Sequence, residues 1–329
     1  MGKLMIYGAT GYTGRIACQH AKSLDLQFVL GGRSQGKLAE LAAQLTAPYM
    51  VFSVDNPDDI ALALKDIKVL LNCAGPFGET AGPLMATCIE KGVHYLDFSA
   101  ELYSYQLAGK LDEKARRSGV MLLPGCGGSV SMLGCLVLHA LRSEEQAVSI
   151  DVALYVTGPM SRGSAISAAA SLSPDCLQRR DGTLVQQDVN STKQFDFDDG
   201  HGPVACFPVT LPDLITIWKS TGVSNIRTFV RTSAGSFPTT DLAALPDGPT
   251  AEQRKANPYH ASVIITKQDN DTRRAVLHTV NGYTFTGIAS VEAAKRVFAG
   301  EVKGGFQTPA EVFGKGFVES VTGSRIVDI

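Results

Sequence analysis

The sequence predicts an α/β protein, with a doubly wound parallel sheet in its N-terminal part and a second, α+β domain with a mixed or antiparallel sheet after it. Short apolar segments alternate with amphipathic helical segments through residue 123, a pattern typical of βαβ units. Three glycines within residues 8–14 separate the first strand from the first helix. From about residue 143 the pattern changes, and across residues 148–156 apolar residues occupy every second position, as in a strand with one covered face.

The N-terminal strands and helices are expected to follow one another with short connections. Apolar runs predict strands at Leu4–Tyr7, Gln27–Gly31, Tyr49–Val54, Val69–Ala74, His94–Phe98 and Val120–Leu123. Helical periodicity predicts helices at Gly14–Leu24, Asp58–Lys65, Tyr103–Arg117 and Met132–Leu141. Two more helices are predicted: one that begins after Ser34 as its N-cap, and one that ends near Gly92. Because strands that are apolar throughout are buried on both faces, helices should cover both sides of this sheet.

The second domain is expected to be an α+β domain for substrate binding and dimerisation. Alternation across Val148–Val156 predicts a strand, and residues 259–266 and 273–280 flank a turn and predict a hairpin. Residues 235–258, rich in Pro, Ala and Thr, predict a surface loop. We place the domains at 1–142 and 143–283, and a helical pattern from residue 284 onward predicts that 284–329 packs back on the first domain.

Composition excludes several classes of protein. A formal net charge of −2 without any basic block disfavours nucleic acid as a partner. There is no apolar run of about 18 residues, so no membrane span is expected. The N-terminus does not resemble a signal peptide, and the seven scattered cysteines form no CxxC pair. We therefore expect buried free thiols in a cytoplasmic protein without a metal site.

The glycine-rich segment predicts a dinucleotide site. Between the first strand and the first helix, glycines allow a tight turn and close approach of a pyrophosphate, and the helix N-terminus presents N–H groups to it. The spacing is GxxGxxG rather than GxGxxG, and its position after the opening strand indicates a Rossmann domain. The residues expected to contact the cofactor here are Gly8, Thr10, Gly11, Tyr12, Thr13 and Gly14.

The end of the second strand predicts which cofactor binds. NAD-specific sites carry an acid there that accepts a hydrogen bond from the ribose 2′-hydroxyl. This chain has Arg33 and Ser34 instead, with Lys37 one turn later and no acid. Because these side chains can hydrogen-bond a 2′-phosphate that a carboxylate would repel, we predict NADP(H).

One missing motif and one family resemblance indicate which class of NADP-dependent enzyme this chain belongs to. None of the nine tyrosines is followed by Lys four residues later, so the Tyr-x-x-x-Lys machinery of short-chain dehydrogenases is absent. The chain instead resembles the saccharopine dehydrogenase-like NADP-binding oxidoreductases, a group that includes trans-acting enoyl reductases. The matching segments are Gly8–Gly14, Gly32–Ser34, Asn72–Phe77, Gly92–Glu101, Ser161–Ala165, Ser220–Val223 and Gly305–Pro309. The resemblance implies a Rossmann domain, a second α+β domain, NADP(H) and a homodimer, but no single substrate.

One segment departs from that family. Where relatives typically have Gly-Phe-Asp followed by Pro-Ser-Asp, this chain has Pro124-Gly125-Cys126-Gly127-Gly128-Ser129-Val130-Ser131. Because these acids are missing, recognition of an amino-acid ammonium group is in doubt, and saccharopine itself is disfavoured as the substrate.

Candidate site residues follow the expected strand ends, where ligands bind in doubly wound sheets. Beyond the fourth strand, Cys73, Ala74, Gly75 and Pro76 are expected to contact the cofactor. Phe77, Asp97 and Arg162 are candidates for substrate binding. Hydride transfer needs a proton donor near the product atom, for which we consider Tyr95, Glu101 and Ser129, in that order.

Three functions remain open at this point. The first is an NADPH-dependent reductase acting on a C=N, C=C or C=O bond of a small, partly apolar metabolite in the interdomain cleft. The second is an acyl-phosphate or semialdehyde dehydrogenase, in which Cys126 in its Pro-Gly-Cys turn would be the nucleophile. The third is a non-catalytic redox sensor that binds NADP(H). Strand-end loops and a large second domain favour the reductase.

Overall fold

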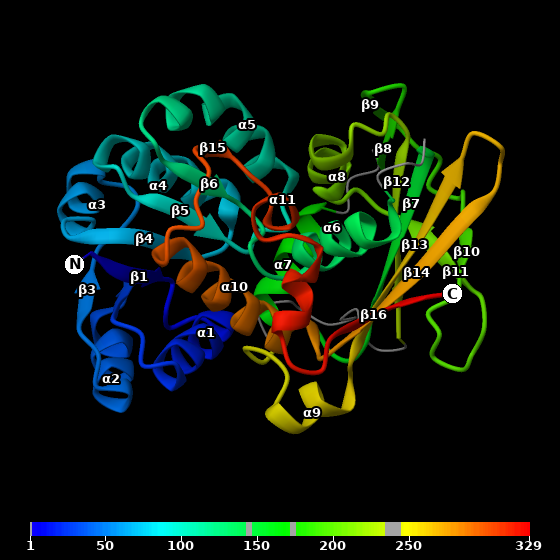
Figure 1. Cartoon of the computed structure of the whole chain (residues 1–329). Helices are drawn as coiled ribbons and strands as arrows, with labels where there is room; N and C mark the ends of the chain where they lie inside the picture. The colour runs from blue at the N-terminus through cyan, green and yellow to red at the C-terminus, as the bar shows by residue number, and fades with distance from the viewer. Residues whose placement is uncertain (1, 143–146, 172–175, 234–244) are drawn as a thin grey trace. The chain divides into compact units, whose positions relative to one another are not determined.

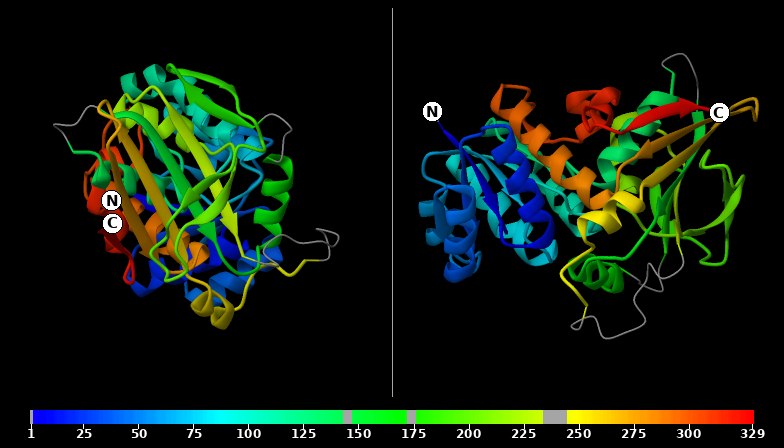
Figure 2. Two further views of the ribbon diagram at one scale, coloured as in Figure 1. Left: turned by 90° about the vertical axis from the view of Figure 1, so that its right-hand side faces the viewer. Right: turned by 90° about the horizontal axis from the view of Figure 1, so that it is seen from below.

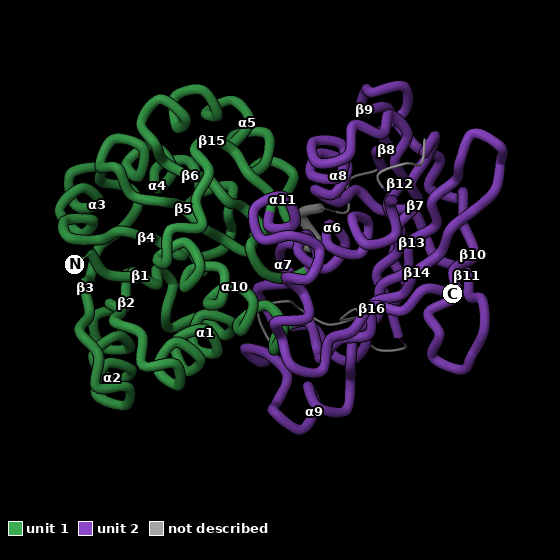
Figure 3. The backbone as a smooth tube through the Cα atoms, in the orientation of Figure 1, with its two compact units in different colours: residues 1–128, 283–308 green, residues 129–282, 309–329 purple. Residues whose placement is uncertain are grey.

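The structure is a computed structural model that describes residues 2–142, 147–171, 176–233 and 245–329. It divides into two compact units, which Figure 3 distinguishes by colour. Unit 1 comprises residues 1–128 and 283–308, and unit 2 comprises residues 129–282 and 309–329. Each unit is built around its own sheet.

Unit 1 alternates strands and helices as the apolar pattern predicts. Its strands are β1 (Lys3–Tyr7), β2 (Phe28–Gly32), β3 (Tyr49–Val51), β4 (Ile67–Asn72), β5 (His94–Asp97), β6 (Met121–Leu123) and β15 (Gly305–Phe306). Its helices are α1 (Tyr12–Ser23), α2 (Gln35–Leu45), α3 (Pro57–Ala63), α4 (Phe77–Lys91), α5 (Leu102–Arg117) and α10 (Gly282–Phe298), whose first residue lies in unit 2.

The sheet of unit 1 has the doubly wound order β15-β6-β5-β4-β1-β2-β3, and its strand pairs are all parallel. Helices cover both of its faces, as Figure 1 shows. Met5, Ile6, Leu70 and Leu71 in the central strands are completely buried, as expected for strands without a solvent face. The predicted α/β class is therefore confirmed, and the carboxyl ends of β1, β2, β4 and β5 lie along one edge of the sheet.

Unit 2 contains a curved mixed sheet with the path β10-β11-β12-β7-β13-β14-β16, to which β8 and β9 attach through β12. Its strands are β7 (Ala147–Val156), β8 (Leu177–Arg180), β9 (Thr183–Gln186), β10 (Lys193–Phe195), β11 (Val204–Pro208), β12 (Ile226–Thr232), β13 (Tyr259–Lys267), β14 (Thr272–Thr279) and β16 (Arg325–Asp328). Its helical segments are α6 (Ser129–Ala140), α7 (Arg162–Ser171), α8 (Asp213–Thr221), α9 (Ala251–Ala256), α11 (Pro309–Phe313) and a 3-10 helix at Lys315–Ser320.

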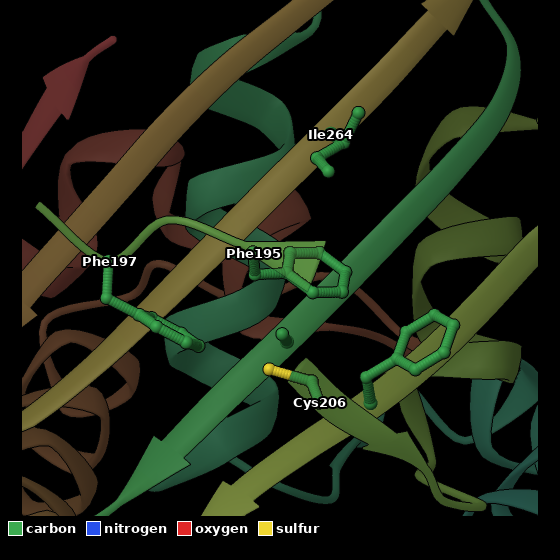
Figure 4. Packing of buried hydrophobic residues seen from close by; sticks show 6 residues of the cluster. Phe195, Phe197, Cys206 and Ile264 are labelled. Atoms are coloured by element: carbon green, nitrogen blue, oxygen red, sulfur yellow. The ribbon is translucent and has the colours of Figure 1, made fainter. Parts of the chain in front are cut away.

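The core of unit 2 explains why its strands alternate in polarity. The left view in Figure 2 looks onto this sheet, whose β12–β7 pair is parallel and whose β7–β13 and β13–β14 pairs are antiparallel. On one face, aromatic residues of the 195–197 segment cover the central strands, as Figure 4 shows. The buried cluster consists of Ala153, Phe195, Phe197, Cys206, Phe229 and Ile264. The predicted hairpin over residues 259–280 is present as β13 and β14.

Two expectations about the chain's organisation differ from the structure. Helix α6 belongs to unit 2 rather than to the first domain, so the division falls after Gly128 and not at residue 142. Of the C-terminal segment expected to pack on the first domain, only the part up to residue 308 belongs to unit 1, because β16 pairs with β14 and places the chain's end in unit 2. The expected loop 235–258 contains helix α9, and its residues 235–244 lie outside the described residues. A Thr250–Gln253 capping box starts α9.

Candidate nucleotide-binding site

The glycine-rich segment is a compact turn between β1 and α1. Gly8 has φ +77°, a left-handed conformation that side chains disfavour. A Cβ atom at Gly14 would overlap the carbonyl oxygen of Gly8, so the helix can pack this closely on the turn only without a side chain there. The N–H of Gly11 donates to the carbonyl of Gly8 at 3.0 Å and closes the turn. Two of the three glycines are thus required by backbone geometry.

The N-terminus of α1 fits an anionic group. The helix begins at Tyr12, and its N-cap Gly11 has no side chain to occupy the first N–H groups. The first turn of α1, which is fully described, contains no acidic side chain. Backbone N–H groups and the helix dipole at such a terminus favour a phosphate. The residues present therefore fit the pyrophosphate of a dinucleotide.

The predicted 2′-phosphate residues lie together after β2. Arg33 and Ser34 follow the last residue of β2, and both are exposed, as is Lys37 on α2. Ser34 is the N-cap of α2 but makes no side-chain cap bond within that helix, so its hydroxyl is not committed to the helix. Arg33 lies close enough to the Tyr7 hydroxyl to oppose the rise in the pKa of that hydroxyl caused by burial. These residues offer positive charge and hydrogen-bond donors where β2 ends.

The segment after β4 packs directly on the glycine turn. A Cβ atom at Gly8 would lie 2.7 Å from the backbone nitrogen of Ala74, so the two backbones are in contact. The N–H of Cys73 donates to the carbonyl of Tyr7 at 2.7 Å and extends the pairing of β4 with β1. Gly75 and Pro76 are exposed, whereas the Cys73 side chain is buried. If residues 73–76 contact the cofactor as predicted, the contacts would come from their backbone and from the exposed Gly75 and Pro76.

Helix α10 adds a wall that the sequence pattern did not reveal. The Tyr283 ring packs edge-on against the Tyr12 ring, with ring centroids 5.2 Å apart. A Cβ atom at Gly287 would lie 2.5 Å from the Cγ2 atom of Ile16, so α10 packs closely on α1, beside which Figure 1 shows it. The small residue at position 287 within a helical pattern is the one signal that could have indicated this contact.

A buried hydrogen-bond chain links the ends of β4 and β5. The Nδ2 atom of Asn72 donates to the hydroxyl of Tyr95 at 3.1 Å, and that hydroxyl donates to the Oδ2 atom of Asp97 at 2.8 Å. The Oδ1 atom of Asp97 accepts from the N–H groups of Ser99 and Gly125, each at 2.9 Å. Burial raises the pKa of Asp97 to about 6, and these donors oppose the rise.

Three of the predicted catalytic residues are completely buried or held by structural hydrogen bonds. Tyr95 is completely buried and its hydroxyl belongs to that chain, so it reaches no surface of unit 1. The Glu101 carboxylate caps α4, accepting from the N–H of Phe77 at 3.1 Å and of Gly78 at 2.7 Å. Cys126 is completely buried, and burial raises the pKa of its thiol well above the ordinary value, which opposes formation of a thiolate. The geometry therefore does not support these side chains as proton donors or nucleophile.

The remaining candidates for substrate contact lie in different places. Phe77 is buried at the start of α4, and Asp97 is buried beneath the turn at Gly125. Ser129, which begins α6, is partly exposed and belongs to unit 2. Arg162, also in unit 2, donates to the carbonyl of Leu245 and pairs with Asp247 at 2.9 Å. Its charge is partnered, which disfavours a role as a substrate anchor.

Asp213 in unit 2 is an unusual acid that the sequence did not single out. It is completely buried at the start of α8, and neither carboxylate oxygen has a hydrogen-bond partner among the described residues. Burial raises its pKa to about 7 from the model-compound value of 3.8. The folded protein therefore holds this proton more tightly than the unfolded chain, and stability should fall as pH rises from about 4 to about 7.

Replacing Asp213 with Asn should remove this pH dependence. Relative to the wild type, Asp213→Asn is expected to gain roughly 2–3 kcal/mol of unfolding free energy between pH 5 and pH 8, because the wild type must bury an ionised carboxylate at pH 8. Urea unfolding of both proteins at the two pH values measures this. An identical stability difference at pH 5 and pH 8 would contradict it.

Among the described residues, no group of three or more His, Cys, Asp or Glu side chains is placed to hold a metal ion. In the same residues, no helix combines the length and apolar character needed to cross a bilayer.

The fold and the glycine turn together define a class of protein: a two-unit chain in which unit 1 has a glycine turn at the carboxyl edge of a doubly wound sheet, the edge at which such sheets bind dinucleotides. Within that class, residues 4–123 match the family described as the saccharopine dehydrogenase NADP binding domain. The N-terminal part thus matches an NADP-binding domain of the saccharopine dehydrogenase type, which confirms the resemblance and the prediction of NADP(H) as the cofactor.

Two curated proteins and one solved structure are similar to this chain. A mouse saccharopine dehydrogenase-like oxidoreductase is 28% identical over 144 residues, which cover 38% of this chain and 34% of that protein. A trans-acting enoyl reductase from Mycobacterium leprae is 27% identical over 132 residues, covering 38% of this chain and 32% of that protein. The chain thus matches only about a third of the length of these curated relatives. The structure of saccharopine dehydrogenase (L-Glu forming) from Saccharomyces cerevisiae has the same fold, with a TM-score of 0.70 over the whole of both chains at 11% identity.

Proposed function

We propose that this protein is an NADPH-dependent oxidoreductase that reduces a C=N, C=C or C=O bond of a small, partly apolar metabolite. The observation that carries the proposal is the combination of a glycine turn at the N-terminus of α1 with Arg33 and Ser34 at the end of the neighbouring strand β2. Such a pair suits one ligand with a pyrophosphate and a 2′-phosphate. NADPH, when bound, supplies a hydride to the substrate.

The chain's own residues would bind and orient the reactants. The α1 N-terminus would hold the pyrophosphate, Arg33 the 2′-phosphate, and the exposed Gly75–Pro76 pair would flank the rest of the cofactor. Of the three side chains considered as proton donors, Tyr95 belongs to the buried hydrogen-bond chain and the Glu101 carboxylate caps α4, whereas Ser129 is partly exposed. We therefore favour Ser129 for positioning or transferring the proton.

The charged side chains among the candidate site residues indicate the charge of the substrate. Residues 124–131 contain no acid that could pair with an ammonium group, and Arg162 is already paired with Asp247. These features favour an uncharged or partly apolar substrate. The homodimer through unit 2 and the cytoplasmic location both remain predictions.

The reductase proposal can be tested by following NADPH consumption with a panel of uncharged imines, enones and aldehydes. We expect turnover with at least one class of substrate, and loss of that turnover in the Arg33→Asp variant at limiting NADPH. Tight NADPH binding without turnover of any member would favour the non-catalytic sensor instead.

The thiol mechanism makes a different prediction for Cys126. Because this side chain is completely buried with a disfavoured thiolate, Cys126→Ser should leave NADPH binding and hydride transfer within about threefold of the wild type. Steady-state kinetics with the substrate found in the panel measures this. Complete inactivation of a folded Cys126→Ser protein would instead support a nucleophilic cysteine.

A further inference from the structure

The buried chain at the ends of β4 and β5 holds the exposed turn of the nucleotide site. Asn72 holds that turn directly and through α4: its Oδ1 atom accepts from the N–H of Ala74 at 3.0 Å, and its Nδ2 atom donates to the hydroxyl of Thr80 in α4 at 3.0 Å. That hydroxyl in turn donates to the carbonyl of Ala74 at 2.7 Å. The N–H and the carbonyl oxygen of Ala74 are thus both held by hydrogen bonds to buried side chains, those of Asn72 and Thr80.

Tyr95 completes the orientation of the Asn72 amide. Its hydroxyl accepts from Asn72 and donates to Asp97, so the direction of each bond is determined. Asn72, Tyr95 and Asp97 are all completely buried, and water cannot replace a bond that is lost. A change at Tyr95 should therefore be transmitted to the Ala74 backbone, which lies against Gly8 of the glycine turn.

The sheet order determines which part of a bound nucleotide this turn would meet. The strands run β5-β4-β1-β2, with the pyrophosphate position at the end of β1 and Arg33 at the end of β2. If the 2′-phosphate end lies over β2, the opposite, nicotinamide end must extend over β4 and β5, where residues 73–77 lie.

We propose that Tyr95 is a positioning residue, which acts through Asn72 to hold the 73–77 turn in the geometry that receives the nicotinamide half of the cofactor. This inference rests on the proposed binding of NADP(H). It assigns Tyr95 an indirect role: its hydroxyl touches neither cofactor nor substrate, and it determines how the cofactor's reactive end is bound.

The test compares two ligands in two matched variants. Tyr95→Phe removes only the hydroxyl in the chain, whereas Tyr105→Phe removes another buried hydroxyl of unit 1, which donates to the carbonyl of Ser99 at 2.5 Å. Each protein is titrated with NADPH and with 2′,5′-ADP, which has no nicotinamide half. We expect Tyr95→Phe to weaken NADPH binding about 10-fold and 2′,5′-ADP binding less than twofold. Tyr105→Phe should bind both ligands as the wild type does.

A purely structural role would weaken both ligands equally, because the whole site would be perturbed. Equal loss of both ligands, or unchanged NADPH binding in a folded Tyr95→Phe protein, would overturn the inference while leaving the proposed function intact. If the wild type bound 2′,5′-ADP and NADPH equally weakly, at millimolar concentrations, the proposed function would fail and this inference with it.

A second pair of variants keeps the test decisive if Tyr95→Phe does not fold. Thr80→Val removes the hydroxyl that holds the Ala74 carbonyl, and Thr80→Ser retains it. We expect Thr80→Val to reproduce the selective loss of NADPH binding and Thr80→Ser to restore it to within about twofold of the wild type. Equal NADPH affinities in the two variants would overturn the inference.

Discussion

Gly14→Ala is expected to weaken the binding of NADPH and NADH alike by at least about 100-fold. The new Cβ atom would overlap the Gly8 carbonyl oxygen, so α1 and the glycine turn could not keep their present contact. Overpacking of this kind costs about 1–3 kcal/mol, and displacement of the helix N-terminus also removes the N–H groups that face the pyrophosphate. Fluorescence titration of the folded variant with each nucleotide measures the loss.

Gly36→Ala is the matched control for that experiment. Gly36 lies in α2 of the same unit, and no atom lies within 4 Å of the position its Cβ would take. The same substitution should therefore leave nucleotide binding unchanged and stabilise α2 by up to about 1 kcal/mol. If Gly14→Ala bound NADPH as tightly as Gly36→Ala does, the glycine turn would not be the pyrophosphate site.

Arg33→Asp should produce a selective loss. Replacing the guanidinium with a carboxylate removes charge-assisted hydrogen bonds and adds repulsion toward a 2′-phosphate, which together correspond to about 100-fold weaker NADPH binding. NADH has no 2′-phosphate, and the new carboxylate can accept from its 2′-hydroxyl, so NADH binding should be unchanged or stronger. The measurement is the ratio of the two dissociation constants in each protein.

Lys37→Asp is an informative comparison because Lys37 lies one turn further along α2 and is also exposed. It should reduce NADPH binding less than Arg33→Asp, through the loss of a more distant charge. An equal loss of NADPH and NADH binding in Arg33→Asp would show that this side chain does not recognise the 2′-phosphate.

Much of unit 1 was predictable because its strands are apolar throughout and its helices are amphipathic. Strands such as β1 and β4 differ by one to two residues from the ranges expected. The return of α10 and β15 to this unit was harder to place in detail, because β15 is two residues long and its contact with β6 depends on tertiary structure. The start of unit 2 at α6 was missed because an apolar helix fits either core.

Some residues of the candidate site could likewise be predicted from the sequence, and others could not. Glycines and the basic residues after β2 carry a local pattern, so Gly8, Gly14 and Arg33 could be selected from the sequence alone. Tyr95 and Glu101 were selected because they are polar residues at a strand end, but a sequence does not show whether such a group faces a ligand or a backbone N–H. In the structure Tyr95 donates to Asp97, and Glu101 caps α4.

We propose that unit 1 binds NADPH selectively through its glycine turn and Arg33. The most direct test is a fluorescence titration of the purified wild-type protein with NADPH and, separately, with NADH. We expect saturable NADPH binding that is at least about 10-fold tighter than NADH binding, because the 2′-phosphate would be paired with Arg33. Absence of binding by either nucleotide, or equal affinity for both, would contradict it.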